Sequence, residues 1–332
     1  MNSKSFPDNV LIIGSGMGGL STALILSQLG SKTTVIEKNL LAGGLMRGYI
    51  RDGIECPVGV HYLGSLDHGQ VLRRLFDFLG VSPKIPVEKM GANGIIDQYI
   101  FEDFAFNLPE GLDAYEKNLQ NAFPKEHRQI TAIIKAIRRN GNKMHALDFL
   151  FSTQNDPPML EEIKPVGALL TELNCSPGLR AVLGVPCCWI GVPMASCPVF
   201  YHNMVLATYL FSSWRLKCSG AELVNVFSER LRSLGGNIIK GDGVEKILVN
   251  SRVVEGVQLQ SGAVLKSPVV IGAVHPKVVL NMLPDGAVKP SYQRLISKLE
   301  NTDGMFCVHS KVDALNRPEI PHNIFKIKTE KN

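Results

Sequence analysis

The stretch from Val10 to Lys38 reads VLIIGSGMGGLSTALILSQLGSKTTVIEK, and it decides the fold. The apolar run Val10–Ile13 is followed by a glycine-rich turn, by apolar residues at helical spacing, and by a second apolar run, Thr33–Ile36. The glycines have the spacing of a dinucleotide-binding fingerprint: Gly14, Gly16 and Gly19. A strand, a glycine turn, a helix and a second strand in this order predict the start of a Rossmann-like sheet.

Each fingerprint glycine has a mechanical role. Gly14 permits a tight turn, Gly16 lets the backbone approach a pyrophosphate, and Gly19 lets helix and strand pack closely. The helix N-terminus offers N–H groups and a partial positive charge to phosphates. Glu37, about 20 residues further on, can accept hydrogen bonds from a ribose diol. A carboxylate there repels a 2′-phosphate, so NADP is disfavoured. An ordinary βαβ turn is the alternative, and the context of the motif favours the fingerprint.

Composition restricts the class of protein. The 332 residues allow two domains, and 45% hydrophobic against 20% charged residues allow a large core. The net charge of +5 is compatible with peripheral contact with an anionic membrane, and the absence of a dense Lys/Arg block argues against nucleic acid as a partner. Seven cysteines without CxxC spacing indicate reduced, mostly buried thiols, no zinc or other metal site, and a cytoplasmic protein. Residues 1–9 lack an apolar run, so no signal peptide is expected.

Two further motifs extend the first. The glycine pair Gly43-Gly44 follows Glu37 by six residues, and Gly59–Gly64 reads GVHYLG. With the fingerprint, they resemble the FAD-dependent phytoene desaturase, carotenoid isomerase and retinol saturase family, and GVHYLG is most similar to the retinol saturase branch. Pro57 departs from the acidic residue that the family usually carries two places before the glycine of this element. The resemblance implies an α/β fold: a Rossmann-like FAD-binding domain of the glutathione-reductase type with an inserted α+β substrate domain.

The resemblance also implies domain limits and site residues. Residues 1–84 and 217–290 would form the FAD-binding domain, and residues 85–216 and 291–332 the substrate domain. His61 and Tyr62 are the catalytic candidates, as hydrogen-bond donors or a proton source near the flavin, and anchoring a loop is the equal alternative. Arg47 is expected to hold a phosphate, with a solvated loop arginine as the alternative. The FAD-binding candidates are Gly14, Ser15, Gly16, Met17, Gly18, Gly19, Glu37, Lys38, Gly43, Gly44, Leu45, Met46, Arg47, His61, Val244 and Ala273.

The middle of the chain is expected to contain helices and a strand pair. Helices are predicted over 69–80, 112–122 and 126–150, and paired strands within 98–111. The helix over 126–150 has an isoleucine face and a basic face, so it either lies on a membrane or, as we favour, packs on the protein. Residues 178–214 are very apolar but are broken by prolines and glycines, which predicts short helices lining a substrate cavity or a plain core rather than a membrane span. The candidate wall residues are Trp189, Met194, Phe200, Tyr201 and Met204.

From Lys217 the pattern returns to that of the first segment. A helix over 221–234 and strands over 237–240, 244–250, 253–259, 263–265 and 269–273 resemble the family's second FAD segment, where Val244 would meet the adenine through its backbone and Ala273 would lie near the cofactor. His275 is interpreted as a loop histidine. Another strand is predicted over 305–312.

The resemblance implies an FAD-dependent oxidoreductase that saturates or desaturates a carbon–carbon bond of an apolar isoprenoid, with a retinoid as the best specific substrate. The electron donor or acceptor stays open. Polyene isomerisation or carotenoid desaturation is the first alternative, a non-catalytic binding or regulatory remnant the second, and an amine oxidase the third. Family members continue well beyond the position of Asn332, with more of the substrate domain and a final glycine-rich helix at the flavin, so a fragment or a shortened protein is expected.

Overall fold

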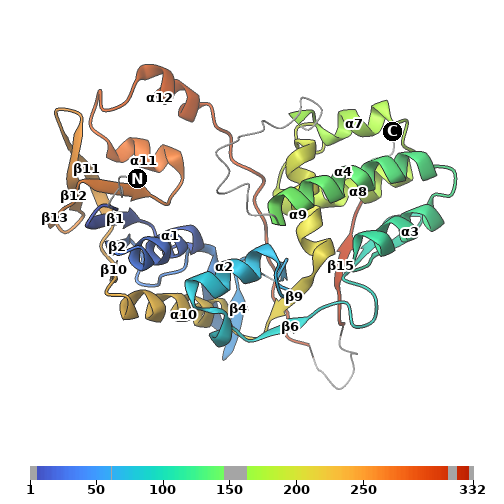
Figure 1. Ribbon diagram of the computed structural model, residues 1–332, viewed down its shortest axis with the longest axis horizontal. Helices are drawn as coiled ribbons and strands as arrows, with labels where there is room; N and C mark the ends of the chain where they lie inside the picture. The colour runs from blue at the N-terminus through green and yellow to red at the C-terminus, as the bar shows by residue number, and fades with distance from the viewer. Residues whose placement is uncertain (1–5, 61, 146–162, 313–319, 329–332) are drawn as a thin grey trace, which may run out of the picture. The chain divides into compact units, whose positions relative to one another are not determined.

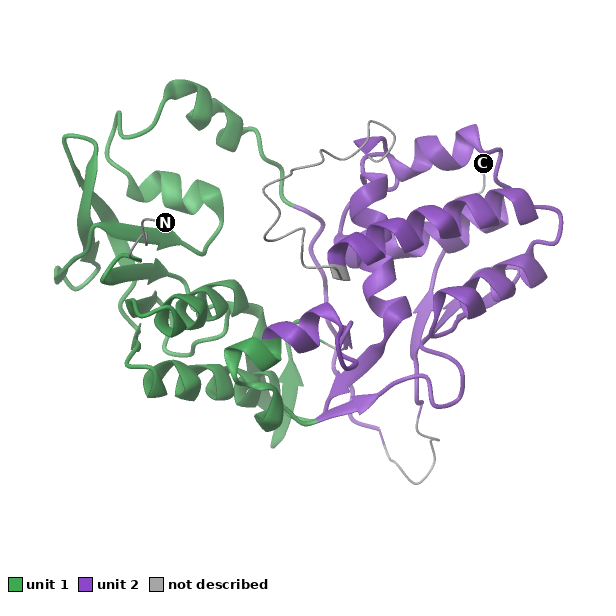
Figure 2. Cartoon of the chain, viewed as in Figure 1, with its two compact units in different colours: residues 1–61, 76–86, 217–301 green, residues 62–75, 87–216, 302–332 purple. Residues whose placement is uncertain are grey.

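The structure is a computed structural model, and it describes residues 6–60, 62–145, 163–312 and 320–328. These residues form two compact units (Figure 2). Unit 1 comprises residues 1–61, 76–86 and 217–301, and unit 2 comprises residues 62–75, 87–216 and 302–332. Each unit is assembled from segments that are distant in the sequence.

Unit 1 is built on a parallel sheet in the order β10-β2-β1-β14. Its strands are β1 (Asn9–Ile13), β2 (Lys32–Glu37), β10 (Asn237–Lys240) and β14 (Val269–Gly272). Helix α1 (Met17–Gln28) connects β1 to β2 and packs beside α10 (Gly220–Ser233), as Figure 1 shows. Val10–Ile13 is fully buried, because a central parallel strand is covered on both faces. The predicted Rossmann-like α/β architecture is therefore confirmed.

Smaller elements complete unit 1. The 3-10 turn η1 (Gly44–Met46) leads into a hairpin of β3 (Gly48–Arg51) and β4 (Ile54–Pro57). Helix α10 begins with a capping box in which Ser219 and Glu222 exchange hydrogen bonds with each other's backbone. The remaining elements are η2 (Ser82–Lys84), an antiparallel sheet of β11 (Val244–Asn250), β12 (Val253–Leu259) and β13 (Val264–Lys266), and helices α11 (Pro276–Met282) and α12 (Pro290–Ser297). Helix α2 (Val71–Leu79) contributes residues to both units.

Unit 2 packs helices against two small sheets. One sheet has the order β15-β7-β8, from β7 (Asp97–Ile100), β8 (Ala105–Leu108) and β15 (Asn323–Lys326), and β15 runs parallel to β7. The other has the order β5-β9-β6, from β5 (Leu63–Gly64), β6 (Val87–Lys89) and β9 (Ser213–Leu216). The helices are α3 (Leu112–Ala122), α4 (His127–His145), α7 (Val166–Glu172), α8 (Pro177–Ile190) and α9 (Val199–Phe211).

The isoleucine face of α4 is used inside the unit. Ile130, Ile133, Ile134 and Ile137 are buried in the hydrophobic core of unit 2. This confirms the interpretation that the helix packs on the protein, and it leaves that apolar face unavailable to a membrane. Residues 146–150 of the predicted helix lie outside the described residues. Among the described helices, none is both long enough and apolar enough to cross a bilayer.

Two local predictions were wrong. The expected short helices are present, with breaks at Gly191 and Pro198, but α8 continues through Gly184 and Pro186, which were also expected to break the run. The turn before Pro186 is supported by a side chain: the buried His202 Nε2 lies 2.8 Å from the Leu183 carbonyl oxygen. Residues 305–312 form no strand, and Phe306 is 94% exposed, because no described strand pairs with them. The strand found near the end of the chain is β15 instead.

Candidate functional site

The glycine turn after β1 is tightly packed at two positions and open at the third. Gly14 has φ +100°, and a Cβ there would lie 2.6 Å from Val274 Cγ1. A Cβ on Gly19 would lie 2.0 Å from the Gly14 carbonyl oxygen, so only glycine lets α1 start this close to the turn. A Cβ on Gly16 would meet no atom within 4 Å. The backbone at Gly16 therefore faces open space, as a close approach to a ligand requires.

Helix α1 begins at Met17 and points its N-terminus into this turn. Gly16 is its N-cap residue, and no described side chain caps the helix there. Its first turn carries no acidic residue, Met17 is half-buried, and Gly18 is exposed. The first N–H groups of a helix have no partner within the helix and carry a partial positive charge. The N-terminus of α1 is thus available to an anion, and a phosphate is the ligand that such N-termini commonly bind.

The second glycine pair lies directly against the first turn. Gly43 forms a bridge with Gly16 and donates its N–H to the Ser15 carbonyl oxygen at 3.1 Å. A Cβ on Gly44 would lie 3.0 Å from the Gly16 Cα. Gly43 and Gly44 have φ values of +116° and +57°, which favour glycine. We call Gly14–Gly19 together with Gly43-Gly44 the glycine cradle.

The residues after the pair point in different directions. The Leu45 side chain is exposed, whereas Met46 is buried. The half-buried Arg47 donates Nε–H to the Gly44 carbonyl oxygen at 2.9 Å, which fixes its guanidinium close to the second glycine pair.

Glu37 is buried at the end of β2, and its carboxylate is fully hydrogen-bonded. Ser15 donates its N–H at 3.1 Å and its hydroxyl at 2.6 Å, and Asn39 donates its N–H at 2.9 Å and its amide at 2.6 Å. Burial alone would raise the pKa of Glu37, but the four hydrogen bonds offset this and hold the pKa below its ordinary value. A ribose hydroxyl would therefore exchange with the Ser15 or Asn39 side chain. The adjacent Lys38 is exposed.

The other two candidates of unit 1 lie in well-packed surroundings. Val244 is buried at the start of β11 in a core cluster with Ile13 and Ile36. Ala273 donates its N–H to the Ile13 carbonyl oxygen at 2.8 Å, and its Cβ faces the Cα of Gly19. His275 caps α11, because its Nδ1 accepts the Lys277 N–H at 3.2 Å.

Of the two catalytic candidates, His61 lies outside the described residues. Tyr62 belongs to unit 2, and its hydroxyl donates to Asp97 Oδ2 at 3.2 Å. Asp97 is fully buried and also accepts the Asn323 amide at 2.7 Å, and the Asn323 oxygen accepts from Arg215 at 3.1 Å. Burial and the Asp97 carboxylate raise the pKa of Tyr62 far above its ordinary value. The hydroxyl therefore stays protonated with its proton directed at Asp97, which makes Tyr62 a poor proton donor to any other group.

Sequence reasoning missed Asp97, Asn323 and Arg215. The one available signal was Asp97 itself, an acidic residue at the start of a strand. Two nearby hydrophobic residues, Ile96 and Tyr99, are buried. Asn323 lies 226 residues away from Asp97 in the chain, so its partnership with Asp97 has no sequence signature.

The five candidate wall residues are not brought together equally. The Trp189 ring lies 5.2 Å from the Tyr209 ring, which lies 4.5 Å from the Tyr62 ring. The Trp189 Nε1–H is buried without a hydrogen-bond partner among the described residues. Met194 packs on the same core, with its sulfur facing Gly184, and Phe200 and Met204 are half-buried. Tyr201 is 51% exposed.

Three comparisons bear on these sites. The NAD(P)-binding Rossmann-like domain family matches residues 12–79, which contain the glycine cradle. An all-trans-retinol 13,14-reductase from Danio rerio is 24% identical over 92% of this chain and 54% of its own length. A 4,4'-diapophytoene desaturase (4,4'-diapolycopene-forming) from Methylomonas sp. is 22% identical over 95% of this chain and 63% of its own length. The chain is a homologue of the retinol reductases and carotenoid desaturases.

Solved structures agree on the fold of this homologue. The PF1083 protein from Pyrococcus furiosus superimposes with a TM-score of 0.65 at 15% identity, over 88% of this chain and 66% of its own. The first segment of unit 1 is thus a Rossmann-like domain of the FAD/NAD(P)-binding type. The chain spans about half the length of the curated retinol reductases that it matches.

Asp97 of this homologue makes the stability of unit 2 pH-dependent. Burial raises the pKa of Asp97 to about 6, against hydrogen bonds from Asn323 and Tyr62 and the charge of Arg215. Because the pKa of Asp97 in the folded chain lies above the ordinary 3.8, the protonated carboxyl stabilises unit 2 fully below about pH 4, and this stabilisation is lost as the pH rises to about 6. The difference between the two pKa values corresponds to about 3 kcal/mol of unfolding free energy. Asp97→Asn is expected to remove this pH dependence.

The fluorescence of Trp189 and Trp214 is the measurement, because both tryptophans of the chain belong to unit 2. Urea unfolding is followed at pH 4 and pH 7. At pH 7, Asp97→Asn should raise the free energy of unfolding above that of the unmodified chain by about 3 kcal/mol more than it does at pH 4. Asp103→Asn is the control, since Asp103 is exposed. An equal effect of Asp97→Asn at both pH values contradicts the prediction.

Proposed function

We propose that the chain binds FAD in unit 1 and belongs to an oxidoreductase that saturates or desaturates a carbon–carbon bond of an apolar isoprenoid. The observation that carries the proposal is the glycine cradle, where two glycine turns lie against each other beside an uncapped helix N-terminus. A dinucleotide needs backbone that comes close to its pyrophosphate, and the open space at Gly16 provides it. The residues present therefore fit the cofactor.

Each part of the cradle has a task in holding the cofactor. The N–H groups of Met17, Gly18 and Gly19 would bind the pyrophosphate, and Glu37 would accept a ribose hydroxyl. The fixed charge of Glu37 disfavours a 2′-phosphate, which argues for FAD over NADP at this position. Bound flavin supplies hydride transfer to or from carbon. Leu45, Met46, Val244 and Ala273 are proposed to line the cofactor, and Ser15 to hold Glu37.

Retinoid-like or carotenoid-like substrates are proposed because the relatives are named for such polyenes. A polyene offers mostly apolar surface, and its burial contributes about 25 cal/mol per Å². Trp189, Met194, Phe200 and Met204 are proposed to contact it, and the buried Trp189 Nε1–H can bind a hydroxyl group of such a molecule. Tyr62, held by Asp97, would orient rather than protonate the substrate, and His61 is proposed to lie near the flavin.

Membrane contact and an electron partner belong to the same proposal. Isoprenoid polyenes dissolve in bilayers, so peripheral contact would give access to them. A saturase also needs a source of electrons, and a desaturase needs an acceptor.

The test has two steps. First, the purified chain is mixed with FAD, excess cofactor is removed, and the visible spectrum is recorded. Retained flavin bands support the cofactor, whereas a folded, colourless protein overturns it and leaves a non-catalytic remnant. Second, all-trans-retinol is supplied with chemically reduced flavin, and the products are separated. Loss of one double bond with consumption of reducing equivalents supports saturation. A cis–trans change without consumption supports an isomerase instead.

A further inference from the structure

Unit 1 contains a cavity outside the glycine cradle. It has a volume of about 170 Å³ and lies between α10, the end of β10, and the residue pairs 41–42 and 47–48 on either side of Gly43-Gly44. Three cationic side chains line it, from Arg47, Arg232 and Lys240, together with the amide of Asn225. No aspartate or glutamate is among the described lining residues. The lining therefore has a net positive charge and fits an anion.

A loop separates this cavity from the cradle. The Gly43 N–H faces Ser15, whereas a Cβ on Gly43 would lie 2.6 Å from Val224 Cγ2, and Val224 lines the cavity. None of residues 14–19 lines it. Its volume is also below the roughly 300–1,000 Å³ of sites for drug-sized ligands. The cavity thus suits a single phosphate-bearing head group rather than a second dinucleotide.

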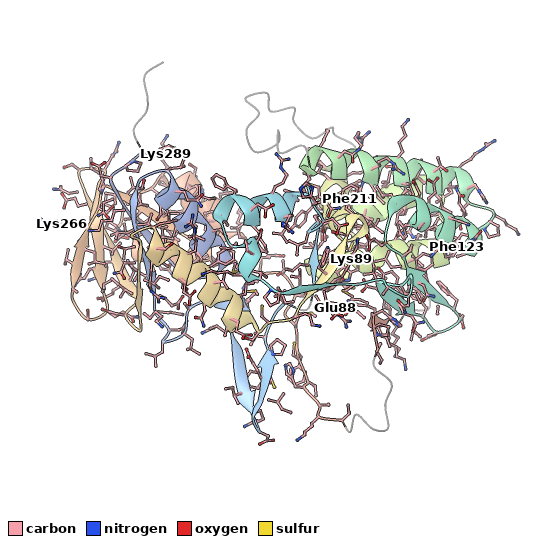
Figure 3. All side chains as sticks on the ribbon, turned by 60° about the horizontal axis from the view of Figure 1, so that its bottom comes forward. Glu88, Lys89, Phe123, Phe211, Lys266 and Lys289 are labelled. Atoms are coloured by element: carbon pink, nitrogen blue, oxygen red, sulfur yellow. The ribbon has the colours of Figure 1, made fainter. Side chains whose placement is uncertain are left out.

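Exposed apolar side chains lie on the loop and the hairpin that contribute lining residues to the cavity. Leu40, Leu41 and Ile50 are between 62% and 80% exposed. Leu41 lines the cavity, and so does Gly48, the first residue of the β3–β4 hairpin. Figure 3 shows this hairpin, in pale blue, extending away from the body of unit 1. Large exposed aliphatic side chains beside a basic cavity match a ligand that has both an anionic head and an apolar tail.

The charges of the cavity favour the same ligand. The hairpin carries one cation, Arg51, and two acids, Asp52 and Glu55, whereas the described lining of the cavity carries three cations and no acid. The positive charge is therefore concentrated in the cavity, where the anionic head group of a phospholipid would bind.

We propose that this face of unit 1 binds an anionic phospholipid bilayer. The phosphate head group lies among Arg47, Arg232 and Lys240, and Leu40, Leu41 and Ile50 enter the acyl region. The proposal stands on the cavity and its rim and does not depend on the catalytic activity. It differs from the membrane interpretation of α4, whose apolar face is buried.

The test uses the full chain and vesicle sedimentation. Vesicles of phosphatidylcholine alone are compared with vesicles that also contain phosphatidic acid. The variant is Arg232→Gln with Lys240→Gln, both exposed residues outside the cradle. The matched control is Lys266→Gln with Lys289→Gln, two exposed lysines of the same unit that are labelled in Figure 3. We expect binding to the acidic vesicles only, weakened at least about tenfold in the cavity variant and unchanged in the control.

A second variant tests the apolar rim. Leu40→Ser with Ile50→Ser should weaken binding to acidic vesicles even at low salt. Equal weakening in the cavity variant and the lysine control would overturn the proposal, because the general positive charge of the surface, and not a specific site, would then explain the binding. Saturable binding of inorganic phosphate without vesicle binding would also overturn it, in favour of a soluble phosphate ligand. The flavin absorbance of the cavity variant should be unchanged, and its loss would assign the cavity to the cofactor instead.

Discussion

Gly16→Val is expected to abolish flavin retention while leaving unit 1 folded. Gly16 has φ −61° and ψ 169°, an extended conformation that valine adopts without strain. A Cβ there meets no protein atom within 4 Å, so the new side chain occupies the open space of the cradle. That space is where the pyrophosphate would approach the backbone. We expect at least a hundredfold weaker FAD binding, which corresponds to about 2.7 kcal/mol.

Flavin absorbance per protein is the measurement, together with thermal unfolding of the cofactor-free chain. Gly18→Ala is the control, because a Cβ on the exposed Gly18 also meets no atom within 4 Å, and alanine keeps the backbone N–H that would donate to the pyrophosphate. It should keep its flavin. A Gly16→Val protein that retains its flavin absorbance would mean that the cofactor binds elsewhere. A colourless variant with an unchanged melting temperature would show that binding is lost while the fold is kept.

Unit 1 could be predicted from the sequence because its signals are local. The strands 237–240, 244–250 and 253–259 were predicted with the limits that the structure gives. Glycines with positive φ separate these elements, as Gly235 does after α10. The fingerprint glycines lie within a few residues of each other, so their steric roles follow from spacing alone.

Unit 2 depends more on distant partners. β15 joins β7 across more than half of the chain, and neither segment specifies the other. Residues 305–312 have strand-forming side chains, but β propensity acts only where a partner strand exists. Pro186 was expected to end a helix, and neighbouring α9 supplies the side chain that supports the turn before it. The buried Asp97 became recognisable only when Tyr62, Arg215 and Asn323 were placed around it.

Gly19→Ala is expected to destabilise unit 1 by about 2–4 kcal/mol. Its Cβ would lie 2.0 Å from the Gly14 carbonyl oxygen and 3.2 Å from the Ala273 Cβ. The first contact is with backbone, so no side-chain rotation relieves it, and α1 must move away from β1. Alanine is the better helix former by about 1 kcal/mol, which offsets a small part of the cost.

Gly18→Ala isolates the steric contribution, because it brings the same gain in helix propensity one residue earlier without a clash. Urea unfolding of the cofactor-free chain is followed by far-ultraviolet circular dichroism for both units and by tryptophan fluorescence for unit 2, which holds Trp189 and Trp214. Gly19→Ala should lower the circular-dichroism midpoint, and Gly18→Ala should keep or raise it. Equal midpoints for the two variants would mean that α1 relaxes without cost. The close approach of α1 to the turn at Gly14 would then not be what requires a glycine at position 19.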